Sequence, residues 1–186
     1  ATFFQLVGLM LSSANADVNN LDLATLPAHA DRLSDYISDI WGSPEDTRGG
    51  LKTLTVTNRR LMSRLRAYAR FEHGLIRLSD EAFTAGLAAQ RHILQSLFTA
   101  DGVLTRHTLL LKAESTGLLS DLQLVLLGFG IKSTVAGQQL SIDPACLGAF
   151  ARHISLLSTT KQDTLLALAS NAATPAELWD TFDSLT

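Results

Sequence analysis

The sequence carries one pattern of helices and strands twice, and this repeat limits most strongly how the chain can fold. An apolar helical run at 3–14, FFQLVGLMLSSA, has a counterpart at 92–102, HILQSLFTADG, and both end in small residues. In each half a second amphipathic helix then ends in an aromatic residue and a glycine. Trp41 follows residue 13 by 28 positions, and Phe129 follows residue 101 by the same 28. A fixed spacing of this kind indicates a duplicated supersecondary unit.

Strands are predicted where apolar and polar residues alternate. The clearest stretches are 17–25, 51–57, 105–113 and 138–143. A β-branched run at 131–137 adds a strand in the second half, whereas Pro44, Gly49 and Gly50 weaken its counterpart around 43–50. The last strand of each half is expected to lead into a third helix. The sequence therefore predicts an α/β (α+β) fold of two αββαββα halves related by a pseudo-twofold axis.

The repeat also predicts the domain organisation. We expect one half at 1–78, a second at 79–158, and a C-terminal helical extension at 159–186. Within the extension, TTKQDTLLALASNA (159–172) is predicted to be a helix with Thr159 or Thr160 as its N-cap. With 46% hydrophobic and 18% charged residues, the chain can bury a core, which excludes a disordered or fibrous protein.

Charge and composition exclude several broad classes of partner. The formal net charge of −3 gives no global attraction to nucleic acid or anionic lipid, so any such affinity must be local. No apolar stretch reaches the roughly 18–20 residues of a membrane span, and we expect no membrane partner. The first sixteen residues lack the basic flank of a secretory signal and predict a buried helix. The single cysteine, Cys146, fits a reducing compartment, so we expect a cytoplasmic location.

The sequence around the second apolar helix resembles a known family. LFTADG (97–102) at the end of an apolar helix, then a strand, then LLSDLQLVLLGFGIKS (118–133), is similar to the second half of a LAGLIDADG homing endonuclease domain. The resemblance is to those in inteins of cobalamin-dependent ribonucleotide reductases, and 3–14 takes the place of the first signature helix. It implies two signature helices packed at the centre and antiparallel sheets that form a saddle over duplex DNA. No splicing-block residues are visible, so self-splicing is not implied.

The signature helices can also be examined on physical grounds. Gly8 and Ser12 lie four residues apart, as do Ser96 and Ala100. Residues at this spacing share one helix face, so each helix offers a stripe of small residues. Two such stripes let helix backbones approach closely, a rule best documented in membranes. We therefore expect the two helix ends to meet at one point.

The resemblance implies an acidic residue at each helix end, where it would hold a divalent metal over the scissile phosphates. Asp101 occupies that position in the second half, but Ser13 occupies it in the first, so one acid is lost. A hydroxyl does not replace a carboxylate as a Mg²⁺ ligand of similar strength. Basic residues that the family carries on the last strand of each half are missing at 55–57 and 141–143. We therefore expect a vestigial Asp101 and no cofactor, with Mg²⁺ required only if cleavage survives.

Basic residues are concentrated in one part of the chain. Between Thr47 and Arg77 there are eight Lys and Arg and one acid, Glu72, so this window has a net charge of +7 and the rest −10. Such asymmetry is a candidate electrostatic footprint for phosphates. The arginines of 59–70 are predicted to form the outer face of an amphipathic helix; solvent, an acidic protein partner and duplex DNA remain open as its neighbours. The candidate DNA contacts are Arg48, Lys52, Arg106, Lys112 and Lys132.

Three functions follow from this sequence. The leading prediction is a catalytically degenerate homing-endonuclease-like domain with residual or repurposed double-stranded DNA binding. The alternative is a protein-interaction or assembly module, an intein-endonuclease relic that serves as a structural part of a larger complex such as a ribonucleotide reductase. The third is a live Mg²⁺-dependent DNA endonuclease.

Overall fold

The computed structural model describes residues 1–12, 21–25, 32–38, 45–46, 52–56, 58–73 and 75–172. In the first half the described elements are, in chain order, α1 (Thr2–Ser12), β1 (Leu21–Thr25), a helix at 32–38, β2 (Glu45–Asp46), β3 (Lys52–Val56) and α3 (Arg59–Arg66). The strands form an antiparallel sheet in the order β1-β3-β2. Its register pairs Leu21 with Val56 and Thr25 with Lys52.

The second half repeats this order more completely. Its elements are α5 (Leu87–Asp101), β6 (Val103–Leu104), β7 (Leu109–Lys112), α6 (Thr116–Gly128), β8 (Ser133–Ala136), β9 (Gln139–Ile142), the 3-10 turn η1 (Pro144–Cys146) and α7 (Leu147–His153). The four strands form an antiparallel sheet in the order β6-β7-β9-β8. This arrangement confirms the predicted mixed fold with αββαββα order in the second half. The boundaries between the predicted domains stay a prediction.

A hairpin and a short helix that the sequence did not predict connect the two halves: β4 (Ala69–Glu72), β5 (Leu75–Leu78) and α4 (Asp80–Thr84). The expectation of an arginine-bearing helix over 59–70 is therefore wrong at its end. The helix stops at Arg66, and Arg70 lies on β4, paired with Arg77 of β5. Beyond the helix, Ser79, which follows β5, donates hydrogen bonds to the backbone carbonyls of Ala67 and Tyr68.

The extension begins with α8 (Thr159–Ala172), which confirms the helix predicted there. Its N-cap is Ser158 rather than Thr159 or Thr160, because the Ser158 hydroxyl accepts a hydrogen bond from Lys161 N. Leu165 is the fully buried residue of this helix, which packs on α7. The final aromatic residues, Trp179 and Phe182, lie outside the described residues. None of the helices in the described ranges is long and apolar enough to span a membrane.

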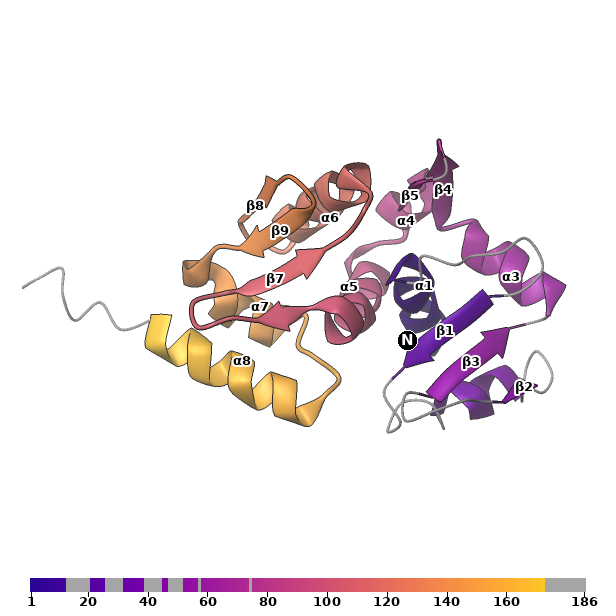
Figure 1. Cartoon of the computed structure of the whole chain (residues 1–186), viewed down its shortest axis with the longest axis horizontal. Coiled ribbons are helices and arrows are strands. Elements are labelled where there is room, and N and C mark those ends of the chain that lie inside the picture. Colours follow the sequence, from indigo (N-terminus) through magenta and orange to yellow (C-terminus); the bar gives the residue numbers. More distant parts are fainter. Residues whose placement is uncertain are drawn as a thin grey trace, which may run out of the picture.

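The two apolar helices, α1 and α5, lie side by side at the centre of the molecule, with one sheet on either side (Figure 1). Gly8 of α1 makes this contact close: a Cβ atom at that position would lie 2.1 Å from Ser96 Oγ and 2.3 Å from Ile93 O. The predicted small-residue stripes are thus in contact. Across the same interface Gln5 Nε2 donates a hydrogen bond to Gln95 Oε1 over 3.3 Å, and both side chains are buried.

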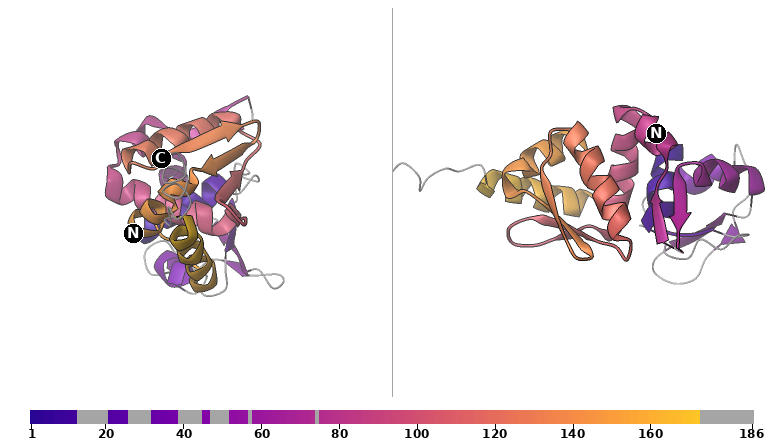
Figure 2. Two further views of the ribbon diagram at one scale, coloured as in Figure 1. Left: turned by 90° about the vertical axis from the view of Figure 1, so that its left-hand side faces the viewer. Right: turned by 90° about the horizontal axis from the view of Figure 1, so that it is seen from above.

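The strands of both halves lie along the same side of the molecule, as the view from above shows (Figure 2). On the second sheet, Leu109, Leu111, Leu140 and Ile142 are buried and form the face toward the core. Because successive side chains of a strand point to opposite faces, Lys112, Gln139 and Ser141 lie on the outer face. This outer face, together with the ends of α1 and α5, forms the setting of the candidate site.

Candidate functional site

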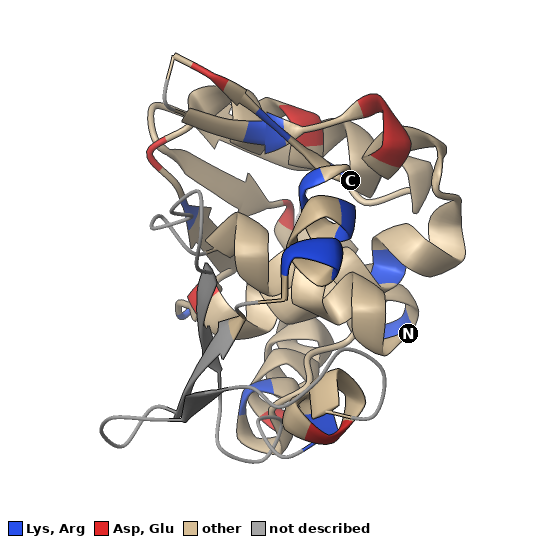
Figure 3. Ribbon diagram, turned by 90° about the vertical axis from the view of Figure 1, so that its right-hand side faces the viewer, with Lys and Arg blue, Asp and Glu red and all other residues tan. Residues whose placement is uncertain are grey.

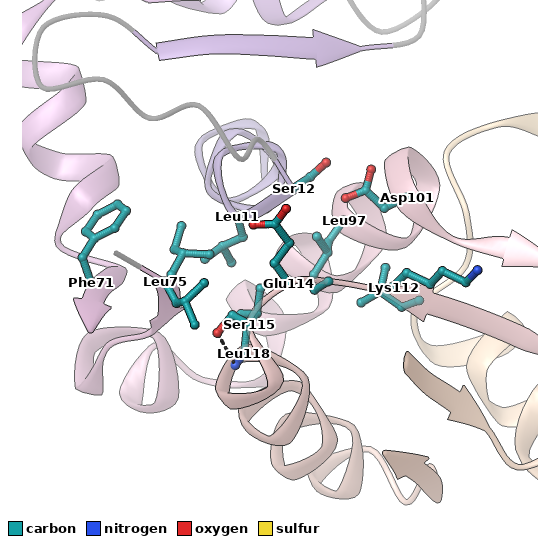
Figure 4. A pocket seen from close by; sticks show the side chains of 13 residues that line it. Leu11, Ser12, Phe71, Leu75, Leu97, Asp101, Lys112, Glu114, Ser115 and Leu118 are labelled. Carbon is teal, nitrogen blue, oxygen red and sulfur yellow. Dashed lines mark hydrogen bonds between the residues drawn. The ribbon is translucent and has the colours of Figure 1, made fainter. Parts of the chain in front are cut away.

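The ends of the two central helices meet, as the repeat predicts. Ser12 is the last residue of α1 and Asp101 the last of α5, and the Ser12 hydroxyl lies close enough to lower the pKa of the Asp101 carboxyl. Figure 4 shows the two side chains at the adjacent helix ends. Ser13, the predicted position of the lost acid, lies outside the described residues. The described partner of Asp101 on α1 is thus a hydroxyl.

Burial and two neighbours act in opposite directions on Asp101. Desolvation raises the pKa of the half-buried Asp101 above its ordinary value, while the Ser12 hydrogen bond and the positive charge of Lys161 lower it, and burial prevails. Lys161 comes from α8, where burial lowers its own pKa. Its ammonium donates hydrogen bonds to Thr99 O (2.7 Å) and Gly102 O (3.1 Å) at the C-terminal end of α5.

Replacing Asp101 with asparagine should raise the free energy of unfolding at pH 7. The raised pKa means that folding disfavours the ionised carboxylate, and this cost is present wherever the folded protein carries the charge. The increase in the free energy of unfolding caused by Asp101→Asn should therefore be constant above the raised pKa. It should shrink as pH falls through that pKa and vanish below 3.8, the ordinary value. Urea unfolding of both proteins between pH 3 and pH 8 measures it; equal stability at pH 7 would contradict this expectation.

A pocket of about 340 Å³ opens beside the helix ends, between the β4–β5 hairpin and the start of α6. Its floor is apolar and includes Leu11, Leu97 and Leu118, while its polar lining includes Asp101, Lys112 and Glu114. Figure 4 shows the Glu114 and Asp101 carboxylates on the same side of this pocket, near Ser12. An apolar floor with a few converging polar groups is the usual character of a binding site.

The helix ends do not fit the paired-acid metal centre that the fold implies. The carboxylate of Asp101 is half-buried, faces a hydroxyl rather than a second acid on α1, and lies within the field of the Lys161 ammonium. Hard divalent cations take several oxygen ligands at one point, often from carboxylates, and a neighbouring cation repels them. Within the part of the chain that the structure describes, no group of three or more His, Cys, Asp or Glu could hold a metal ion.

The structure places three of the five predicted DNA-contact residues at exposed positions in the second half. Lys112 is exposed at the end of β7 and lines the pocket with Asp101. Arg106 is exposed in the β6–β7 turn, and Lys132 is exposed just before β8. Lys52 begins β3, but its side chain, like all of Arg48, lies outside what the structure describes. The four strands of the second sheet carry no acidic residue, so nothing on them repels a phosphate.

The arginines of the first half lie elsewhere. Figure 3 shows basic residues gathered along α3, a helix away from the strand side of the molecule. Asn58 caps this helix by accepting from Arg60 N and Leu61 N, and Leu61 and Leu65 are buried beneath it. The predicted basic outer face is therefore present over the shorter span 59–66. It is not part of the strand side on which Lys112 lies.

Sequence reasoning missed two groups near the site. One is Lys161, which is 60 residues beyond Asp101 in the chain and carries no motif. The other is an ion pair between the hairpin and α6, in which Arg77 Nε and Nη2 donate to Asp121 at 3.0 and 2.6 Å. A DLQ segment within an apolar helix was the available signal, because a lone acid on a buried helix face requires a partner.

Comparison with known proteins identifies the fold. The sequence matches no protein-family model and no curated protein. The structure of I-DmoI in complex with DNA and Mn superposes with a TM-score of 0.65 at 14% identity, covering 83% of this chain and 96% of I-DmoI. The complex of I-DmoI with DNA and Ca gives 0.65 at 13% identity, over 89% and 97% of the two chains.

A third structure covers almost the whole chain. Full-length DUF199/WhiA from Thermatoga maritima has a TM-score of 0.61 at 12% identity, and the match spans 99% of this chain and 64% of WhiA. These levels of identity establish the fold and not the activity. The chain has the fold of the LAGLIDADG homing endonucleases, as the resemblance in its sequence implied.

Proposed function

We propose that this chain is a catalytically degenerate LAGLIDADG-type domain that binds double-stranded DNA on its strand side and does not cut it. One observation carries the proposal: the exposed face beside the helix ends bears Lys112 and uncharged polar groups, whereas Asp101 is half-buried beside a hydroxyl, Ser12, and in the field of Lys161. I-DmoI, which shares the fold, has been solved bound to DNA. The fold thus provides a surface shaped for duplex DNA, and the residues of this chain bind the duplex without cleaving it.

Duplex binding should depend on the exposed cations of the second half. The triple variant Arg106→Gln, Lys112→Gln, Lys132→Gln should weaken binding to random duplexes. It should also reduce the slope of log affinity against log salt by up to about 2.7, because each phosphate contact contributes about 0.9. Electrophoretic shifts at two or more salt concentrations, with and without Mg²⁺, measure both quantities.

The control carries the same change of charge elsewhere. Arg59→Gln, Arg60→Gln, Arg152→Gln removes three exposed cations from α3 and α7 and should change the salt slope by less than about 1. If the two triple variants lost equal affinity for duplex DNA, binding on the strand side would be contradicted. Mg²⁺-dependent strand cleavage that is lost in Asp101→Asn would show a live endonuclease and overturn the proposed degeneracy.

A second candidate function rests on a separate surface. Leu87 at the start of α5 and Leu124 and Leu127 on α6 are 53%, 60% and 52% exposed. These two helices meet there, since a methyl group at Gly128 would lie 3.5 Å from Leu87 Cδ2. Apolar patches of this kind occur at protein interfaces. Association with a host protein, such as a ribonucleotide reductase, that persists at high salt and is lost in Leu124→Lys would favour this assembly role.

A further inference from the structure

The C-terminal end of α5 is occupied by a cation from elsewhere in the chain. The last carbonyls of a helix have no partner within it and carry partial negative charge. Lys161 Nζ donates hydrogen bonds to two carbonyls at this end, Thr99 O and Gly102 O. Asp101 is the last residue of the same helix, and its charge raises the pKa of Lys161 against the effect of burial. The ammonium therefore contacts the helix-end carbonyls and is attracted by the charge of Asp101.

The backbone around Lys161 is fixed to α5 by several contacts. Leu157 N donates to Thr99 Oγ1 over 2.9 Å, within the last turn of α5. Leu156 N donates to Gln162 Oε1 over 2.7 Å, and the Ser158 hydroxyl caps the start of α8. Gln95 Nε2 adds hydrogen bonds to Ile154 O (3.2 Å) and Ser155 Oγ (2.9 Å). The segment that presents Lys161 is thus attached along two turns of α5, and the ammonium is held in place.

We infer that Lys161 is the resident cation of the central helix ends and excludes a divalent metal from Asp101. The residues there do not fit a metal centre, and Lys161 gives the physical reason. A metal bound to Asp101 would place two like charges together in a half-buried site, where they repel more strongly than in water. This inference rests on the proposed function and deepens it. At the centre of the strand side, the negative charge of Asp101 is balanced by a lysine of the same chain and not by a metal ion.

The test measures metal binding in the absence of DNA. Mn²⁺ is titrated into the full chain, with binding followed by calorimetry and by the loss of the free Mn²⁺ paramagnetic resonance signal. The wild-type chain and Lys161→Arg, which keeps the charge, should show no saturable site that depends on Asp101. Lys161→Gln should gain one, with Mn²⁺ affinity at least about tenfold tighter. Lys161→Gln combined with Asp101→Asn should lose it again.

Each outcome decides the inference. A wild-type Mn²⁺ site that disappears in Asp101→Asn would overturn it, and this measurement holds even if a Lys161 variant does not fold. A folded Lys161→Gln chain, checked by circular dichroism, that binds Mn²⁺ no more tightly than wild type would overturn it as well. Because no DNA is present, these results are independent of the duplex-binding experiment, so failure of one proposal is distinguishable from failure of the other.

Discussion

A single methyl group added at Gly8 should destabilise the protein by about 3 kcal/mol, at the upper end of the usual cost of overpacking. In Gly8→Ala the new Cβ would lie 2.3 Å from the backbone carbonyl oxygen of Ile93 and 2.1 Å from Ser96 Oγ. The hydroxyl can rotate, but the carbonyl belongs to α5 and cannot move without its helix. The two central helices must therefore separate, and the buried stripe between them loses contact. Urea unfolding at neutral pH measures the loss.

Gly148 provides a matched control for this prediction. It lies in α7, where a Cβ atom would have no neighbour within 4 Å. The same change, Gly148→Ala, should leave stability unchanged or raise it by up to about 1 kcal/mol, since alanine favours a helix over glycine. If both variants unfold at the same urea concentration, close packing at Gly8 does not hold the halves together.

The second large effect is expected at the ion pair between the β4–β5 hairpin and α6. The Asp121 side chain is 4% exposed and accepts hydrogen bonds from Arg77 and from Leu78 N at 3.1 Å. Asp121→Ala removes both, leaving the partly buried guanidinium with only the exposed Glu72 as a partner and the buried Leu78 N–H without its acceptor. Loss of one member of a buried pair costs about 3–5 kcal/mol, and Arg77, at 28% exposure, places this case near 3. Chemical denaturation gives the value.

Two further variants separate the pair from its surroundings. Glu72 also accepts from Arg77, at 3.2 Å, but its side chain is 45% exposed, so Glu72→Gln should cost less than about 1 kcal/mol. The double variant Arg77→Met, Asp121→Leu should be more stable than the sum of the single losses, because it leaves no unpaired charge. If the double variant loses as much stability as the two single variants together, the two residues act independently.

Much of the fold could be predicted because the repeat locates elements by spacing. The second half shows this best: the apolar run ending at Gly102 is α5, and the Leu-rich run after Ser115 is α6. The hairpin at 69–78 could not be found in the same way. Its residues, ARFEHGLIRL, place Arg70 and Arg77 seven positions apart, a spacing that fits one face of a helix as well as two paired strands. Tertiary contacts decide between the two, since Arg77 pairs with Asp121 from 44 residues away.

The candidate site was only half predictable. Asp101 could be placed from the sequence because it ends an apolar helix and the neighbouring LFTADG resembles a known signature. That α1 would end beside it followed from the small residues at Gly8 and Ser96. Lys161 could not be found, because it belongs to a mostly exposed helix of ordinary composition and reaches the site only through the turn at 154–158. No local pattern encodes a contact across 60 residues.

The packing of α1 on α5 has a consequence for biosynthesis. Gly8 meets its partner Ile93 only after about 85 further residues have been added, which at roughly 5–20 residues per second takes several seconds. During that time α1, with seven buried residues in the finished protein, has an apolar surface and no partner helix on the ribosome. Nascent chains should therefore be most prone to aggregate before Leu97 emerges. Chaperones that shield short hydrophobic segments should raise the yield more when added during translation than during refolding.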